Sequence, residues 1–190
     1  MRFQVSPDDI KRANIPHEIF LTNLIGNHIL MAVGAGGVAG TYPWIMAIIP
    51  LTSFALLSYI LWRARRSLTR DPWYPMCHWQ VCARRSRIFI LMLSLLLAIV
   101  LLGWVGYSYL GLRREAVLAI IVGLGILPIM ATVLVLILLE SETLYHANQA
   151  KLPAWVVALH PSPPRSRSSK RSNPTTTTED RVPVVKDWGI

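Results

Sequence analysis

Three polar side chains interrupt an apolar stretch near the N-terminus and could carry chemistry. Asn23, Asn27 and His28 lie within residues 20–39, where most neighbours are aliphatic or small. An ionisable side chain inside a membrane-spanning segment is by default a candidate for a proton path, an ion path or a cofactor ligand. The competing interpretation is structural, with a neutral His28 hydrogen bonded to Asn23, Asn27 or Thr52 across a helix interface. The structural interpretation is the one we expect.

Haem is a cofactor that His28 could bind as an axial ligand. Bis-histidine haem would need a second histidine at a similar depth. The other four histidines fall in polar parts of the chain or at the membrane edge, namely His17, His78, His146 and His160. We therefore expect no cofactor and keep a haem-bearing membrane anchor as an alternative. A small transporter, channel or immunity protein with a polar path near Asn27 and His28 is a second alternative.

A short cluster of potential metal ligands lies between the second and third apolar segments. It contains Cys77, His78 and Cys82, and His146 is the nearest further candidate on the same side. A tetrahedral zinc site needs four ligands, and two cysteines separated by four residues do not have the spacing of a zinc or redox pair. Because the cytoplasm is reducing, we expect two free thiols and no metal site.

Two acids lie at the end of the last apolar segment and could form a cation site. Glu140 and Glu142 are more simply explained as exposed acids on a helix extension that pair with an arginine-rich connector, and this we expect. The chain has no recognisable nucleophile–base pair, paired catalytic carboxylates or metalloprotease motif. We therefore predict that the protein is not an enzyme, and we identify no small-molecule substrate.

The scaffold that positions these side chains is predicted to be a membrane bundle. The 190 residues are 53% hydrophobic and 15% charged, against roughly 25% charged in soluble proteins, and the mean hydropathy is +0.44. Four apolar windows are long enough to cross a hydrocarbon core of about 30 Å. They are residues 20–39, 42–62, 88–110 and 116–139. We predict an all-α protein with four transmembrane helices in two hairpins; for residues 20–39 a re-entrant or interfacial segment remains an alternative.

The charge of the segment between the two predicted hairpins indicates orientation. Residues 62–88 carry seven arginines and one aspartate, a formal charge of +6, whereas the turn at residues 111–115 carries +1. Short loops rich in Lys and Arg stay in the cytoplasm, so we predict cytoplasmic termini in a bacterial inner membrane. The net charge of +9 then reflects topology and attraction to anionic lipids, not nucleic acid binding. The residues expected at the headgroup level are Arg63, Arg65, Arg66, Trp73, Trp79, Arg84, Arg85 and Arg87.

Small residues at the end of the first window predict close helix packing. Gly36 and Gly40 are four residues apart, a spacing that lets two helix backbones approach in a membrane. The neighbour is either another helix of this chain or a helix of a partner subunit. The residues expected at this contact are Ala32, Gly36, Ala39 and Gly40.

Five regions follow one another along the chain. They are a polar cytoplasmic arm (1–19) without a signal peptide, a first hairpin (20–62), a basic connector (63–87), a second hairpin with a cytoplasmic extension (88–151) and a low-complexity basic tail (152–190). Two helices should exceed the bilayer, residues 76–110 and residues 116–151, and Pro128 should bend the second.

The tail ends in a short apolar segment. Residues 162–178 are rich in Ser, Pro, Thr and Arg and are expected to be disordered, because they cannot bury enough apolar surface. Val184, Val185 and Trp188 are expected to dock on a partner or on the protein's own cytoplasmic face. Together these features favour a non-enzymatic accessory or scaffold subunit of a larger inner-membrane complex of the secretion, conjugation or respiratory type. Its expected partners are membrane lipids and other integral membrane subunits.

Overall fold

The protein is helical throughout the part described by a computed structural model, residues 3–38 and 40–161. No strand occurs among these residues. The elements in chain order are α1 (Pro7–Leu21), η1 (Thr22–Met31), α2 (Ala32–Val38), η2 (Pro43–Ala47), α3 (Ile48–Arg70), α4 (Trp73–Tyr109), α5 (Arg114–Ile120), η3 (Ile121–Ile126), α6 (Leu127–Asn148) and α7 (Ala154–Leu159).

Consecutive elements merge into four long helices. These span Pro7–Val38, Trp44–Arg70, Trp73–Tyr109 and Arg114–Asn148, and each is long and apolar enough to cross a membrane. The prediction of an all-α chain with four such helices is therefore confirmed. At 1.5 Å rise per residue, the 37 residues of α4 cover about 55 Å, more than a hydrocarbon core of about 30 Å.

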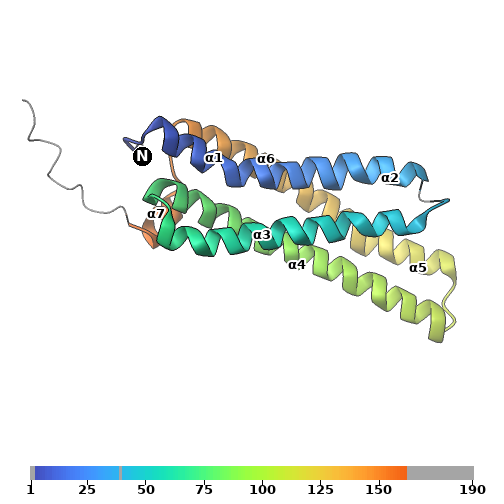
Figure 1. Cartoon of the computed structure of the whole chain (residues 1–190). Coiled ribbons are helices and arrows are strands. Elements are labelled where there is room, and N and C mark those ends of the chain that lie inside the picture. Colours follow the sequence, from blue (N-terminus) through green and yellow to red (C-terminus); the bar gives the residue numbers. More distant parts are fainter. Residues whose placement is uncertain (1–2, 39, 162–190) are drawn as a thin grey trace, which may run out of the picture.

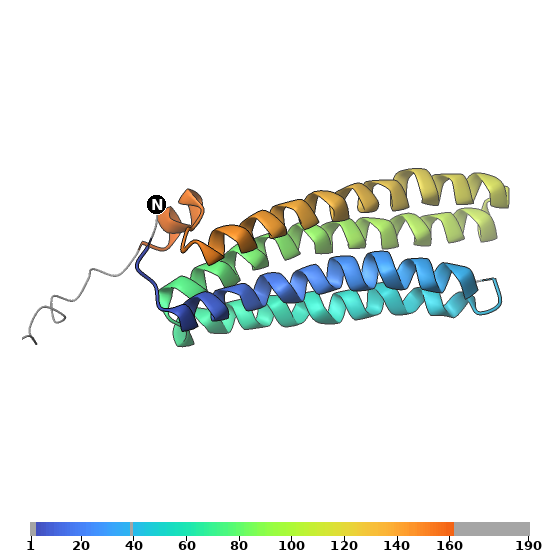
Figure 2. The same cartoon turned by 90° about the horizontal axis from the view of Figure 1, so that it is seen from above.

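The four long helices run side by side, as Figures 1 and 2 show. The rod formed by α1, η1 and α2 lies along α3, and α4 lies along α5, η3 and α6. The two pairs meet because α4 packs against both α1 and α3, and α1 also packs against α6. We call the end that holds the start of α1, the junction of α3 with α4, and α7 the connector end. The end with residues 40–42 and 110–113 is the opposite end.

The buried apolar side chains form two clusters. One apolar core cluster joins the middle of all four helices, with Phe20, Leu57, Phe89 and Val133 among its buried members. A second cluster sits at the connector end itself, where Ala13, Tyr74, Cys77, Val81, Leu152 and Val156 pack together. The Trp73 Nε1–H donates to the His160 carbonyl oxygen at 2.9 Å and so holds α7 against the start of α4.

The predicted connector is almost entirely helical. α3 continues to Arg70 and α4 starts at Trp73, so only Asp71 and Pro72 connect them. The predicted N-terminal arm is helical from Pro7, where the Ser6 hydroxyl accepts a hydrogen bond from the Asp9 amide at 3.1 Å. Both segments are therefore parts of the bundle. The helix predicted to begin at residue 76 already included the second part of the connector. The first part of the connector and the N-terminal arm were not predicted to be helical, because charged residues there interrupt the apolar pattern.

Two long helices contain a π-helical segment. A π-helix closes each turn one residue later than an α-helix. In η1 this places Asn23, Asn27 and His28, at positions i, i+4 and i+5, on one face that contacts α3. η3 ends just before Pro128, whose missing N–H breaks one backbone hydrogen bond. A change from π-helix to α-helix therefore lies in the turn before Pro128, where the sequence predicted a bend.

Candidate functional site

A cluster of polar side chains lies between α1, α4 and α6 near the connector end. α1 contributes His17, α4 contributes His78 and Cys82, and α6 contributes Glu140. The side chains of all four are fully buried. His78 and Cys82 are four residues apart on α4, so they share one helix face. His17 precedes the apolar window 20–39, and His78 and Cys82 precede the window 88–110. Glu140 directly follows the window 116–139, so the cluster lies just outside the apolar windows.

The cluster is held by direct contacts between helices. The His17 Nδ1 contacts Glu140 Oε2, and on the other side of the ring Nε2 lies 3.0 Å from His78 Nδ1. The other carboxylate oxygen, Glu140 Oε1, lies 3.0 Å from an Arg85 guanidinium nitrogen. The Cys82 thiol donates to the Pro16 carbonyl oxygen at 3.3 Å. One connected network therefore ties α1, α4 and α6 together.

Burial shifts the pKa values of two members of the cluster, His78 and Cys82. It lowers the pKa of His78 to about 3, and the neighbouring His17 and Arg85 lower it in the same direction. Burial also raises the pKa of the Cys82 thiol well above its ordinary value. At neutral pH His78 is thus a neutral imidazole and Cys82 a thiol. The buried His78 Nε2 has no hydrogen-bond partner among the described residues.

The cluster has the residue types of a cysteine–histidine–acid triad but not its geometry. In such a triad the histidine takes the proton of the nucleophile while its second nitrogen faces the acid. Here one nitrogen of His17 faces Glu140, but the other faces His78, and the Cys82 thiol points to a carbonyl oxygen. Since these groups are also fully buried, the arrangement is suited to linking helices or holding an ion, not to attacking a substrate.

The expectation that Glu140 is an exposed acid is wrong. Its side chain is fully buried and pairs with Arg85 and His17, whereas Glu142, two residues later, is exposed. Two residues along a helix correspond to a rotation of about 200°, so the two acids face opposite sides of α6. Both acids were predicted to lie on one exposed surface, and the buried site around Glu140 was therefore not predicted.

A second polar cluster occupies the interface between η1 and α3. The Asn23 side-chain amide donates to Ser53 Oγ at 3.0 Å, and His28 Nε2 lies 2.9 Å from the same oxygen. Asn27 donates to the Ile49 carbonyl oxygen at 2.8 Å. Because one hydroxyl can accept from Asn23 and donate to His28, this geometry fits a neutral imidazole.

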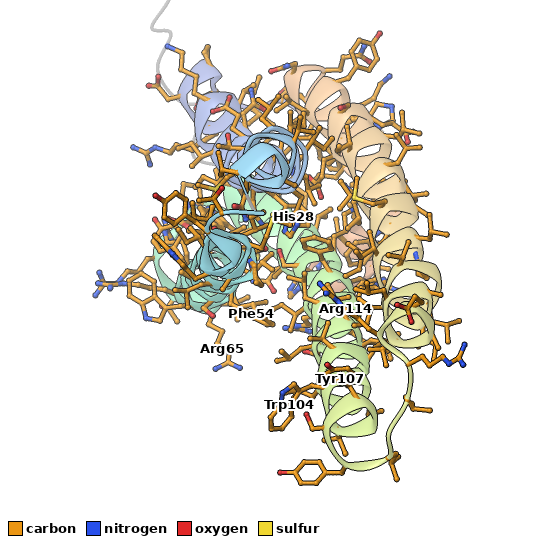
Figure 3. The ribbon with its side chains drawn as sticks, turned by 90° about the vertical axis from the view of Figure 1, so that its right-hand side faces the viewer. His28, Phe54, Arg65, Trp104, Tyr107 and Arg114 are labelled. Atoms are coloured by element: carbon orange, nitrogen blue, oxygen red, sulfur yellow. The ribbon has the colours of Figure 1, made fainter. Side chains whose placement is uncertain are left out.

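His28 therefore pairs with Ser53, not with the partners expected from the sequence. Thr52 donates instead to Asn27 Oδ1 at 2.8 Å, and the His28 ring packs edge-on against Phe89 of α4, with centroids 4.9 Å apart. Figure 3 shows His28 between the helices and Arg65 extending away from the bundle. The hydrogen bonds of this cluster link neighbouring helices, and its members are buried or half-buried.

Several arginines expected at lipid headgroups contact protein groups. Arg63 pairs with Asp71 at 2.8 Å and lies over the Trp79 ring, with its guanidinium carbon 5.1 Å from the ring centroid. Arg84 lies in the same way over Trp155 at 4.7 Å. Residues that instead remain exposed include Arg65 and Arg87. At the connector end, some basic residues thus pack against aromatic and acidic side chains, whereas others are exposed to the surroundings.

Space remains beside the glycines of the predicted packing motif and beside two further glycines nearby, as far as the described residues show. A Cβ atom added at Gly34, Gly36, Gly37 or Gly40 would have no atom within 4 Å. Ala32 is half-buried. Ala39 lies outside the described residues, as does the predicted docking segment with Val184, Val185 and Trp188. Within the described chain, this small-residue face is therefore open.

A shallow groove lies between α4 and α5 toward the opposite end. It has a volume of about 400 Å³ and is lined by aliphatic side chains together with Trp104, Tyr107 and Arg114. Figure 3 shows these three residues along the part of α4 and α5 that diverges from α2 and α3. The groove therefore combines an aliphatic floor with two aromatic rings and one guanidinium group.

Comparisons with protein-family models, with curated proteins and with solved structures gave no match to this chain.

Proposed function

We propose that the protein is a non-enzymatic accessory or scaffold subunit of a larger inner-membrane complex. The observation that carries the proposal is the open glycine face of α2. A Cβ added at the α2 glycines Gly34, Gly36 or Gly37 would meet no atom of the described residues within 4 Å, and α2 makes its main contacts with the neighbouring η1 and η2. The occupant we propose for this face is a transmembrane helix of another subunit.

A run of exposed glycines destabilises a helix unless other contacts compensate. Glycine lowers helix stability by about 1 kcal/mol relative to alanine, and Val33 and Val38 of α2 are exposed. In a bilayer a helix gains little from hydrophobicity when it binds another helix, so association depends on close backbone approach and dispersion contacts. A partner helix that packs against Gly36 and Gly37 would supply those contacts. Lipid chains fit such a narrow face less closely.

The proposed orientation places the connector end in the cytoplasm. The basic residues concentrate there, and short loops rich in arginine remain on the cytoplasmic side. With two hairpins, both termini lie on that side, and the last described residue, Pro161, follows α7. The proposed partners at the membrane face are subunit helices and anionic lipids; the proposed partner of the tail is a cytoplasmic surface of the same complex.

The experiment compares two glycine-to-leucine variants of the full chain. Gly36→Leu fills the open face of α2, whereas Gly123→Leu makes the same change at another open glycine, on η3. Both proteins are extracted from membranes in a mild detergent, and native mass spectrometry reports their size and composition. Wild type and Gly123→Leu should carry the same stoichiometric membrane subunits, and Gly36→Leu should lose them.

Three results would overturn the proposal. In the first, wild-type protein is detected as a 21.3 kDa monomer that carries lipid alone, which means that no partner helix is bound. Gly36→Leu protein that keeps the full set of subunits shows that the open face is not the contact. A complex that contains only copies of this chain identifies a homo-oligomer instead of an accessory subunit.

A further inference from the structure

We propose that His17, Cys82 and Glu140 bind one divalent transition-metal ion at the connector end, and that Zn²⁺ suits the site best. The three residues come from α1, α4 and α6, and each offers one ligand atom. This site goes beyond the proposed subunit role, because it needs no partner protein. Its effect would be to tie together three helices of a single chain.

The geometry of the three side chains fits a tetrahedral ion after a small adjustment. Their ligand atoms all lie within 4.8 Å of one another. With Zn–N and Zn–O distances of about 2.0–2.2 Å and Zn–S distances of about 2.3 Å, ligand atoms of a tetrahedral site are roughly 3.5 Å apart. The sulfur must therefore move closer to the other two ligands, whereas His17 Nδ1 and Glu140 Oε2, which are in direct contact, must separate to admit the ion; rotations of the side chains are the proposed adjustment. The fourth position is left for water.

The groups that surround the three ligands are those that metal sites use. A ligating histidine usually has its second nitrogen hydrogen bonded, and a ligating carboxylate is usually anchored through its other oxygen. When Nδ1 of His17 binds the ion, its Nε2–H donates to His78 Nδ1, which lies 3.0 Å away. When Oε2 of Glu140 binds the ion, Oε1 stays paired with Arg85 at 3.0 Å. His78 and Arg85 are thus positioning residues.

The charges also balance around a divalent ion. Binding releases the Cys82 proton to solvent, so one thiolate and one carboxylate neutralise the two charges of Zn²⁺. His17 binds as a neutral imidazole, and Arg85 adds one positive charge at the edge of the site. A mixed set of thiolate, imidazole and carboxylate favours Zn²⁺ over Mg²⁺ or Ca²⁺, which prefer oxygen ligands alone.

Cobalt binding to the full-length protein tests this site directly. The purified protein is stripped with a chelator in detergent and titrated with Co²⁺, whose thiolate-to-metal charge-transfer absorption and visible d–d bands report a sulfur ligand and tetrahedral geometry. Saturation at one Co²⁺ per chain, followed by displacement with Zn²⁺, is expected. A wild-type protein without the charge-transfer band, or with octahedral Co²⁺ spectra only, would overturn the proposal without any variant.

Matched variants locate the ligands. Cys82→Ala should abolish the charge-transfer band, whereas Cys77→Ala removes the other fully buried thiol and should leave it intact. His78→Phe removes the positioning residue and should weaken Zn²⁺ binding about 10- to 100-fold while retaining the band. A band that persists in Cys82→Ala, or that disappears in Cys77→Ala, contradicts the assignment. Because the readout is spectroscopic and needs no partner, it succeeds or fails independently of the subunit proposal.

Discussion

Glu140→Gln should destabilise the isolated protein strongly even when a chelator removes all metal. The substitution keeps the size of the side chain and removes its negative charge. In the structure the buried carboxylate serves two cationic or polar neighbours, since one oxygen contacts the His17 ring and the other lies 3.0 Å from Arg85. An amide can accept from only one of them and presents an N–H to the other.

The magnitude follows from the burial of the two partners. Breaking a fully buried ion pair costs about 3–5 kcal/mol, because the remaining charge is left unpaired. The Arg85 side chain is 17% exposed and can turn partly toward water, which reduces that cost. Loss of the His17 contact adds about 1–3 kcal/mol for a buried polar group without its partner. These effects overlap, so we expect the free energy of unfolding to fall by about 2–4 kcal/mol.

Equilibrium unfolding in mixed micelles, followed by circular dichroism with chelator present, measures this change. Glu142→Gln is the matched control, because it makes the same chemical change two residues away on the exposed side of α6. Its effect should stay within about 0.5 kcal/mol. A Glu140→Gln protein as stable as the control would refute the claim that this buried network holds α1, α4 and α6 together.

Three further predictions concern the membrane part and the tail. Ser53→Ala should lower the free energy of unfolding by about 1 kcal/mol, since intramembrane hydrogen bonds average roughly 0.6 kcal/mol each and Ser53 contacts two side chains. The control Ser58→Ala, on the exposed side of α3, should have no effect in the same unfolding assay. Because the proposed topology places Arg84 in the cytoplasm and Arg113 on the opposite side, Arg84→Cys should be labelled only after the membrane is permeabilised, and Arg113→Cys should be labelled in intact cells. The two native thiols are fully buried, so the label reports the introduced cysteine, and the reverse pattern would contradict the proposed topology. Deleting residues 182–190 should reduce co-purification of a cytoplasmic partner without changing membrane insertion, and unchanged co-purification would exclude the docking role.

The sequence predicted the helices well because a bilayer imposes a simple rule. Backbone groups in hydrocarbon must be hydrogen bonded within their own segment, so long apolar stretches become helices. Residues 76–110 were expected as one long helix, and α4 covers Trp73–Tyr109. The π-helical geometry of η1 was not predictable in the same way, because it depends on how its polar side chains meet α3.

The buried cluster was missed because its members are far apart in the sequence. His17, Cys82 and Glu140 belong to three different helices, and no local spacing joins them. A partial signal was present in α4, where His78, Cys82 and Arg85 recur at intervals of four and three residues. Such spacing puts polar side chains on one helix face, beside the start of an apolar window. A polar stripe in that position would have indicated a buried interhelical network.

The most direct test of the proposed subunit role is site-specific photo-crosslinking in intact membranes. Val33 is 75% exposed and lies on the same helix face as Gly36 and Gly37, three and four residues later. A photoreactive residue at this position should form discrete adducts with one membrane protein, while the same residue at Leu138, 64% exposed on α6, serves as the lipid-facing comparison. If Val33 yields only lipid adducts, as expected for Leu138, the open face of α2 has no protein partner and the subunit role is contradicted.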